Sequence, residues 1–406
     1  MRMARWTSLA DQVMSNASNW IFTVLVAGLT TPAVFGRFAV AYSVLTFAVA
    51  ALRTGLGYQV SMKAGDRAGV HEESSRAVGA TLATAPALAL VVLAVAGMGP
   101  GTDSALALGL AVGTPFVLIQ DLLRYSAVAA RRTEAALVSD TAWTVLLLVA
   151  VVLRTQGRLD VGVLISLWVI GSVVATAILF WALRIAPLLR GAGRWVRDSW
   201  RGRAHLMSGG LIAGASVPIT AGIVALVAGP EVAAGVAGAG LLMAPVNSLV
   251  AWMSLTLLAR AAIQGGAKKA SVFVKVGAGA ALLAALWGLT MLLVPDDFGR
   301  ILLGEAWPKA AEAMPIVWIQ HAVAVLAATG NLFLISAGRT RAVLGNGVAV
   351  AIARTGLGWI AAVTVATVLA AAVAETLAMA IWLASVFWYL RPKAGTGGLI
   401  RTATMS

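Results

Sequence analysis

Residues 8–62 read SLADQVMSNASNWIFTVLVAGLTTPAVFGRFAVAYSVLTFAVAALRTGLGYQVSM, and this stretch decides the fold. It holds two apolar runs, each long enough to cross a membrane as a helix, separated by a Thr31-Pro32 turn. Polar residues of the first run recur at helical spacing and share one stripe: Gln12, Asn16, Asn19 and Thr23. Because an unsatisfied polar group in hydrocarbon is costly, this stripe is expected to face protein or a watery cavity.

The composition extends this pattern to the whole chain. Of 406 residues, 60% are hydrophobic and 11% are charged, whereas roughly a quarter are charged in soluble proteins. We therefore predict an all-α polytopic membrane protein without a separate soluble domain. The twelve predicted membrane-spanning segments, or spans, are 9–29, 36–60, 78–98, 104–130, 136–153, 160–184, 205–228, 234–259, 272–294, 313–336, 342–366 and 370–390.

The net charge of +14 follows the predicted topology. If the N-terminus is cytoplasmic, the cytoplasmic segments hold 22 of the 30 Lys and Arg residues and the outer segments hold five. This bias predicts that both termini are cytoplasmic. The positive charge then indicates contact with anionic membrane lipids, and no nucleic-acid partner is expected. The chain has no cysteine, so disulfides and cysteine metal sites are excluded.

The second half of the chain repeats the first. The turn at Pro32 has a counterpart at Pro230, and the spacing of the first polar stripe returns 197 residues later in Gly209, Ala213, Ser216 and Thr220. We predict two parallel six-helix lobes, residues 1–184 and 205–406, around a central cavity. A basic cytoplasmic linker, residues 185–204, joins them; its Trp195 and Trp200 among arginines favour a helix at the membrane interface.

Several stretches resemble the multidrug/oligosaccharidyl-lipid/polysaccharide (MOP) flippase superfamily, in particular its bacterial polysaccharide-biosynthesis branch, which is O-antigen-flippase-like. That branch typically has a Leu-Gly-Pro turn and an aromatic-Gly pair after its first helix; here LTTPAVFG at 29–36 is similar, with Thr31 in place of the glycine. Further similar stretches lie at residues 120–140, 227–262 and 301–320. In the stretch 227–262, one aromatic residue is lost and Ala259 stands where a proline is usual.

Ionisable side chains inside spans are candidate functional groups because burying them unpaired is costly. Those singled out are Asp11, Arg53, Asp121, Arg124, His321, Arg354 and Glu375. Arg53 contacts either a substrate phosphate or a structural partner such as Asp11. Arg124 either pairs with Asp121, three residues earlier on the same helix, or faces the cavity.

Two further candidates lie in the second half. Arg354 and Glu375 are at depths where antiparallel helices can bring them together near mid-membrane. This pair is either structural or a gate coupled to transport or protons. His321 is either a hydrogen-bonded interior residue or a proton relay.

The resemblance implies a flippase that moves a polyprenyl-diphosphate-linked oligosaccharide from the inner to the outer leaflet of the bacterial cell membrane by alternating access, for cell-surface polysaccharide biosynthesis. In this reading the polar first and seventh spans line the route, Arg53, Arg124 and Arg354 are candidate diphosphate ligands, and Asp11, Asp121, Glu375 and His321 are candidate coupling groups. Glycosyltransferases and a polysaccharide polymerase are expected partners. No enzyme activity, cofactor or metal is expected. The alternatives are a cation or drug antiporter of the same superfamily and a non-transporting scaffold for glycan assembly.

Overall fold

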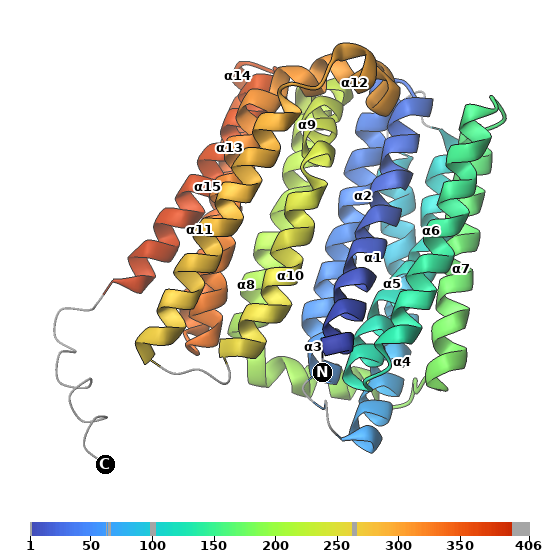
Figure 1. Ribbon diagram of the computed structural model, residues 1–406, viewed down its shortest axis with the longest axis vertical. Coiled ribbons are helices and arrows are strands. Elements are labelled where there is room, and N and C mark those ends of the chain that lie inside the picture. Colours follow the sequence, from blue (N-terminus) through green and yellow to red (C-terminus); the bar gives the residue numbers. More distant parts are fainter. Residues whose placement is uncertain (1, 62, 64–65, 98–102, 262–265, 392–406) are drawn as a thin grey trace.

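A computed structural model describes residues 2–61, 63, 66–97, 103–261 and 266–391. The described residues form helices that pack as two bundles, which we call the N-lobe and the C-lobe (Figure 1). The N-lobe contains α1 (Arg2–Leu29), α2 (Pro32–Leu52), the π-helix η1 (Arg53–Gly57), α3 (Tyr58–Ser61), α4 (Arg67–Ala96), α5 (Ser104–Ala129), α6 (Thr133–Thr155) and α7 (Val161–Leu183).

The C-lobe contains α8 (Ala192–Val227), α9 (Pro230–Leu242), α10 (Ala244–Ala261), α11 (Gly266–Met291), α12 (Asp296–Leu303), the 3-10 helix η2 (Gly304–Ala306), α13 (Trp307–Ser336), α14 (Thr340–Thr364) and α15 (Val368–Leu390). Ten helices of the described part are long and apolar enough to cross a membrane, and the bent pair α9 and α10 makes eleven. The 28-residue α1 brings the count to the predicted twelve. The all-α, two-lobe fold is therefore confirmed.

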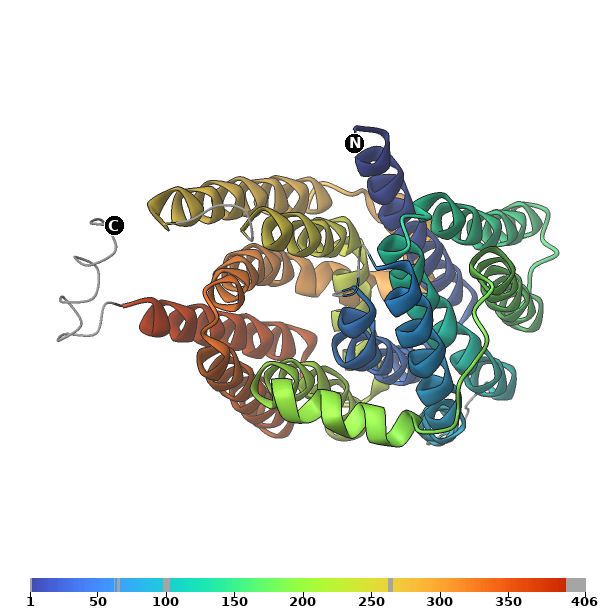
Figure 2. The same ribbon diagram turned by 90° about the horizontal axis from the view of Figure 1, so that it is seen from below.

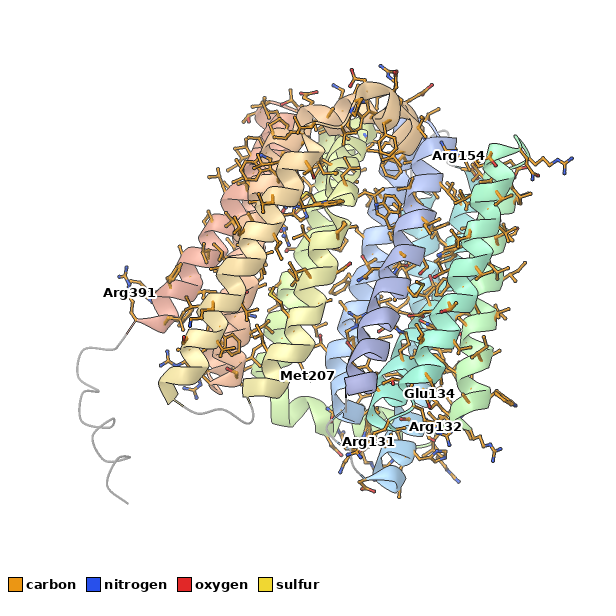
Figure 3. The ribbon with its side chains drawn as sticks, viewed as in Figure 1. Arg131, Arg132, Glu134, Arg154, Met207 and Arg391 are labelled. Carbon is orange, nitrogen blue, oxygen red and sulfur yellow. The ribbon has the colours of Figure 1, made fainter. Side chains whose placement is uncertain are left out.

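The two ends of the molecule differ in charge and structure. Arg131 and Arg132 lie at the end of the molecule where α1 starts (Figure 3). We call this end the basic end. The short helix α12 covers the opposite end, which we call the α12 end and where Arg154 lies (Figures 1 and 3). Aspartates cap three helix starts: Asp66, Asp103 and Asp160 accept hydrogen bonds from the backbone amides of Gly69, Leu106 and Val163.

The predicted repeat is visible in the helix starts on either side of the lobe interface. Both α2 and α9 begin with a proline, whose fixed φ and missing N–H suit the first helical position. Both also are interrupted further along: α2 passes into η1 at Arg53, and α9 meets α10 at an angle of 58°. The two halves therefore share one plan, a continuous first helix followed by a broken second helix.

Glycines of α8 form the seam between the lobes. A Cβ built on Gly214 would lie 3.2 Å from Phe47, one on Gly210 3.7 Å from Thr54, and one on Gly222 3.9 Å from Val40. Small residues allow two membrane helices to approach closely. The N-lobe and C-lobe thus contact each other along α2 and α8.

The connection between the lobes is attached to the N-lobe before it reaches the C-lobe. The Leu188 amide donates to the Ser75 carbonyl of α4 at 2.8 Å, and the Trp195 indole donates to Glu73 at 2.5 Å. The first turns of α8 then cross beneath the molecule from the N-lobe to the C-lobe (Figure 2).

Candidate functional site

Four charged side chains inside the N-lobe form one network across η1, α5 and α6. Arg53 donates to both carboxylate oxygens of Asp121, from Nη2 at 2.7 Å and from Nε at 3.3 Å. Arg124 Nε lies 3.0 Å from Asp140 Oδ2 and Arg124 Nη1 3.7 Å from Asp121 Oδ1. Two arginines and two aspartates therefore neutralise each other within the bundle. We call this set the N-lobe network.

Neutral polar groups complete the N-lobe network. Arg124 Nη1 donates to Ser15 Oγ of α1 at 2.8 Å, and Gln120 Nε2 donates to Asp140 Oδ1 at 2.5 Å. The Arg53 guanidinium also lies over the Tyr125 ring, with its carbon 5.5 Å from the ring centroid. The network thus ties α1, η1, α5 and α6 together in one hydrogen-bonded unit.

Two expectations about the N-lobe network need correction. Arg53 binds Asp121 on α5, whereas Asp11 was the partner considered from sequence; the side chain of Asp11 lies outside the described part of the chain. The expected pair within α5, Asp121 and Arg124, is present but longer than the other two contacts. Arg124 faces Ser15 and Asp140 inside the lobe.

Asp140 is the member of the network that sequence reasoning missed. It lies on the second turn of α6, directly after Ser139 and four residues before Thr144, so a polar patch in an apolar helix was available as a signal. Its side chain is almost fully buried. A buried carboxylate in a span requires a basic partner, and Arg124 is that partner.

Arg53 differs from the other network members in its surroundings. Its side chain is 33% exposed, compared with 9% for Asp121 and Arg124. It is the first residue of η1, where the helix switches to a π-helical turn, a feature often found at functional sites. The neighbouring residues Thr54 and Gly55 lie against α8 of the C-lobe. Arg53 therefore combines charge, partial exposure and a place at the lobe seam.

The predicted pair in the C-lobe is confirmed. Arg354 Nε of α14 donates to Glu375 Oε2 of α15 at 2.8 Å. Arg354 Nη1 also lies 3.3 Å from Ser216 Oγ of α8. His321 Nδ1 is within 2.9 Å of the Val317 carbonyl, one turn earlier on α13. Whether these groups take part in gating or proton transfer stays a prediction.

The polar stripes of α1 and α8 do not have the same surroundings. On α1, Asn19 is exposed and its side-chain oxygen accepts a hydrogen bond from Tyr42 of α2 at 3.0 Å, while Thr23 donates to the Asn19 carbonyl. Asn16 is half-buried, and the Gln12 side chain lies outside the described part of the chain. The α1 stripe is therefore open at Asn19, and its role in lining a transport route stays a prediction.

The α8 stripe faces α14 inside the C-lobe, which contradicts the expectation that it lines a route between the lobes. Ser216 contacts Arg354, Thr220 lies against Gly358, and Gly209 lies against Val343 and Gly347. Ser216 and Thr220 are both buried. The side of α8 that meets the N-lobe carries Gly210, Gly214 and Gly222.

Two tryptophans stabilise the break between α9 and α10. The Trp20 indole of α1 donates to the Leu241 carbonyl at 3.1 Å, and the Trp287 indole of α11 donates to the Leu242 carbonyl at 2.9 Å. Carbonyls at a helix end lack partners within the helix, so these donors satisfy them. Trp20 belongs to the N-lobe, which makes its hydrogen bond a contact between lobes.

The α12 end carries a second contact between the lobes. Arg154 Nη2 at the end of α6 donates to the Ile301 carbonyl of α12 at 2.9 Å. Gly304, with φ +57, lies against the backbone of Ala27 and Gly28 of α1. The Trp307 indole donates to Asp296 at 2.8 Å and fixes α12 on α13. An element of the C-lobe is thus held on the N-lobe.

A scan against family models found no match, and a search of curated proteins found no similar sequence. Solved structures share the fold. An inward-facing multidrug resistance MATE family transporter of the MOP superfamily aligns with a TM-score of 0.69 and 12% identity over 95% of this chain and 98% of that chain. A eukaryotic MATE transporter aligns with a TM-score of 0.68 and 11% identity over 96% and 95%.

A MOP superfamily transporter from Pyrococcus furiosus also aligns, with a TM-score of 0.63 and 14% identity over 95% of this chain and 94% of that chain. Its binding pocket has reverse polarity, which suggests a different function for that protein. All three structures are transporters, and the alignments cover almost the full length of each chain. The chain therefore has the two-lobe fold of MATE transporters of the MOP superfamily.

Proposed function

We propose that the chain is a secondary transporter that moves an anionic lipid-linked oligosaccharide, carried on a polyprenyl diphosphate, across the membrane by alternating access. The observation that carries this proposal is the pairing of acids within the spans. Asp121, Asp140 and Glu375 each contact an arginine at 3.0 Å or less. Away from the ends of the membrane-spanning helices, every carboxylate that the structure describes inside the spans is held by an arginine.

Arg53 is the group that we assign to the diphosphate. Its guanidinium is partly exposed at the lobe seam, and a guanidinium forms paired, charge-assisted hydrogen bonds with phosphate oxygens. Asn19 and Tyr42, which lie on the neighbouring faces of α1 and α2, offer hydrogen-bonding groups to sugars. Arg354 is bound to Glu375 and Ser216 and Arg124 to Asp140 and Ser15, so both are assigned to the structure of their lobes.

A cation or drug antiporter is the second candidate, because the fold is that of MATE multidrug transporters. An antiporter of this kind needs a carboxylate that exchanges its partner for a cation, and Glu375 is the acid most suited to this role. The flippase and the antiporter predict opposite effects of substituting Arg53 and Glu375. For either, we place the basic end in the cytoplasm of a bacterial cell, because basic residues gather on the inner side of membrane proteins.

The test is transport by purified protein in liposomes. For the flippase, a fluorescent polyprenyl-diphosphate oligosaccharide moves between leaflets, Arg53→Gln slows this movement at least tenfold, and Glu375→Gln leaves it within about twofold. Arg158→Gln is the matched control, since Arg158 is exposed at the α12 end. For the antiporter, loaded cations leave the vesicles and Glu375→Gln abolishes their release. Cation release without lipid movement would overturn the proposal.

A further inference from the structure

A cavity of about 470 Å³ lies at the basic end of the N-lobe, away from the seam between the lobes. It is enclosed by the first turns of α4, the turn between α5 and α6, and the end of α7. Figure 3 shows Arg131 and Arg132 of this turn at the basic end, beneath α5 and α6.

The described lining of the cavity carries positive charge and no acidic residue. Arg131, Arg132 and His71 all line it. Arg132 uses one donor on the Ala182 carbonyl of α7 and has further N–H groups on the same guanidinium. Of the carboxylates near the lining in sequence, Glu72 pairs with Arg76 and Glu73 accepts from the Trp195 indole. Glu134, two residues after Arg132, is exposed and does not line the cavity. The cavity therefore favours an anion.

A buried hydroxyl in the wall has no hydrogen-bond partner among the described residues. Ser74 is one of the lining residues and is fully buried, and no other described group accepts a hydrogen bond from its Oγ or donates one to it. Buried hydroxyls on these helices normally donate to a backbone carbonyl one turn earlier, as Thr81 and Ser126 do. An orphaned buried hydroxyl is costly, and an oxygen of a bound ligand would satisfy it.

Arg131 occupies a backbone position that glycine would adopt without strain. Its φ is +59, in the left-handed region, and its amide donates to the Val128 carbonyl at 3.1 Å to close the end of α5. The exposed surface beside the cavity is apolar: Val128 of α5 and Trp181 of α7 both lie open. An exposed tryptophan at a helix end is typical of the membrane interface, so the cavity lies where lipid headgroups lie.

We propose that this cavity binds a phosphate group, held by the guanidinium groups of Arg131 and Arg132 and by the Ser74 hydroxyl. The phosphate comes either from an anionic phospholipid headgroup or from the aqueous phase. The first source fits the apolar surface at Val128 and Trp181, where acyl chains would run along α5 and α7. This site is separate from the transport route and does not depend on which substrate is carried.

The test uses purified full-length protein in neutral detergent and follows thermal unfolding as ligand is added. The probes are dioctanoyl phosphatidylglycerol, dioctanoyl phosphatidylcholine and inorganic phosphate. Arg131→Gly removes the guanidinium and suits the left-handed backbone, so the fold is kept. Arg184→Gly is the matched control: Arg184 is exposed at the same end, also has positive φ (+53), and does not line the cavity. Ser74→Ala removes only the orphaned hydroxyl.

Phosphatidylglycerol is expected to raise the unfolding temperature of the wild type more than phosphatidylcholine does. Arg131→Gly and Ser74→Ala are expected to raise its half-saturating concentration at least fivefold, and Arg184→Gly to leave it within twofold. If inorganic phosphate reproduces the shift with the same variant pattern, the site stands and the aqueous phase is the source. The proposal is overturned if neither anion stabilises the protein, or if Arg184→Gly weakens binding as much as Arg131→Gly.

Discussion

Gly36 of α2 lies directly against the carbonyl oxygen of Pro230 in α9, so that a Cβ on this glycine would overlap that oxygen. The two residues begin the repeat-related helices of opposite lobes, and their contact closes the α12 end. We expect Gly36→Val to wedge the lobes apart there. Because the chain has no cysteine, spin labels at Gln156→Cys and Asp297→Cys can report the separation of the N-lobe and α12.

The matched control for Gly36→Val is Gly240→Val, because nothing lies within 4 Å of a Cβ at Gly240 in α9. The Gly36 variant should shift the distance distribution of the spin labels to longer values, and the control should leave it unchanged. An unchanged distribution in the Gly36 variant would show that this contact does not hold the α12 end closed.

Arg154 should hold α12 on the N-lobe through its hydrogen bond to the Ile301 carbonyl. Arg154→Met keeps an unbranched apolar stem but removes the guanidinium donors, so α12 should separate more often from α6. The same spin labels should then give a broader distribution. Arg158→Met changes an exposed arginine of the same loop and should have no such effect. Equal broadening in both variants would assign the effect to surface charge.

Asp140 should stabilise the N-lobe strongly, because Asp140→Asn removes the closest carboxylate from the buried Arg124 and leaves the Asp121 carboxylate at 3.7 Å. Breaking a buried ion pair by removing one partner costs about 3–5 kcal/mol, so thermal unfolding in detergent should occur at a clearly lower temperature. Asp198→Asn is the control, since Asp198 forms an exposed pair with Arg197 and exposed pairs contribute little. Similar unfolding temperatures for the two variants would contradict the buried network.

Trp20→Phe should affect the equilibrium between lobe arrangements, whereas Trp287→Phe should affect only the stability of the C-lobe. Each change removes one indole donor at the α9–α10 break, worth about 1 kcal/mol, but only the Trp20 hydrogen bond joins the two lobes. Unfolding temperature and spin-label distances, measured on both variants, separate the effects. If both variants change the spin-label distances equally, the geometry of the α9–α10 break, and not the Trp20 contact between the lobes, determines how the lobes are arranged.

The sequence predicted the membrane-spanning helices because each needs an apolar stretch as long as the membrane is thick. It predicted the two lobes and the repeat because similar stretches return in the second half of the chain. It also predicted that Arg354 meets Glu375, since antiparallel neighbouring helices bring equal depths together. The central cavity, the domain boundaries and the roles of the candidate site residues stay predictions.

The helical spacing of polar residues could not predict which neighbouring helix a polar face contacts. It showed that Ser216 and Thr220 share one face of α8, but the same face could meet α14 or the other lobe, and only the packing of the lobe places it on α14. For the same reason Asp121 appeared to belong to Arg124, three residues away, although Arg53 on another helix binds it more closely. Partners on distant helices depend on how the bundle closes.

The attachment of the inter-lobe connection to α4 determines where the chain has to deform when one lobe rotates against the other. The Leu188 and Trp195 contacts keep the first residues of this connection on the N-lobe, and Gly209 onward is packed inside the C-lobe. A rotation of one lobe against the other must then be absorbed within the single helical stretch from 196 to 208. The bending stiffness of that stretch sets the elastic restoring force on the lobes, and so helps to determine which arrangement the empty protein prefers.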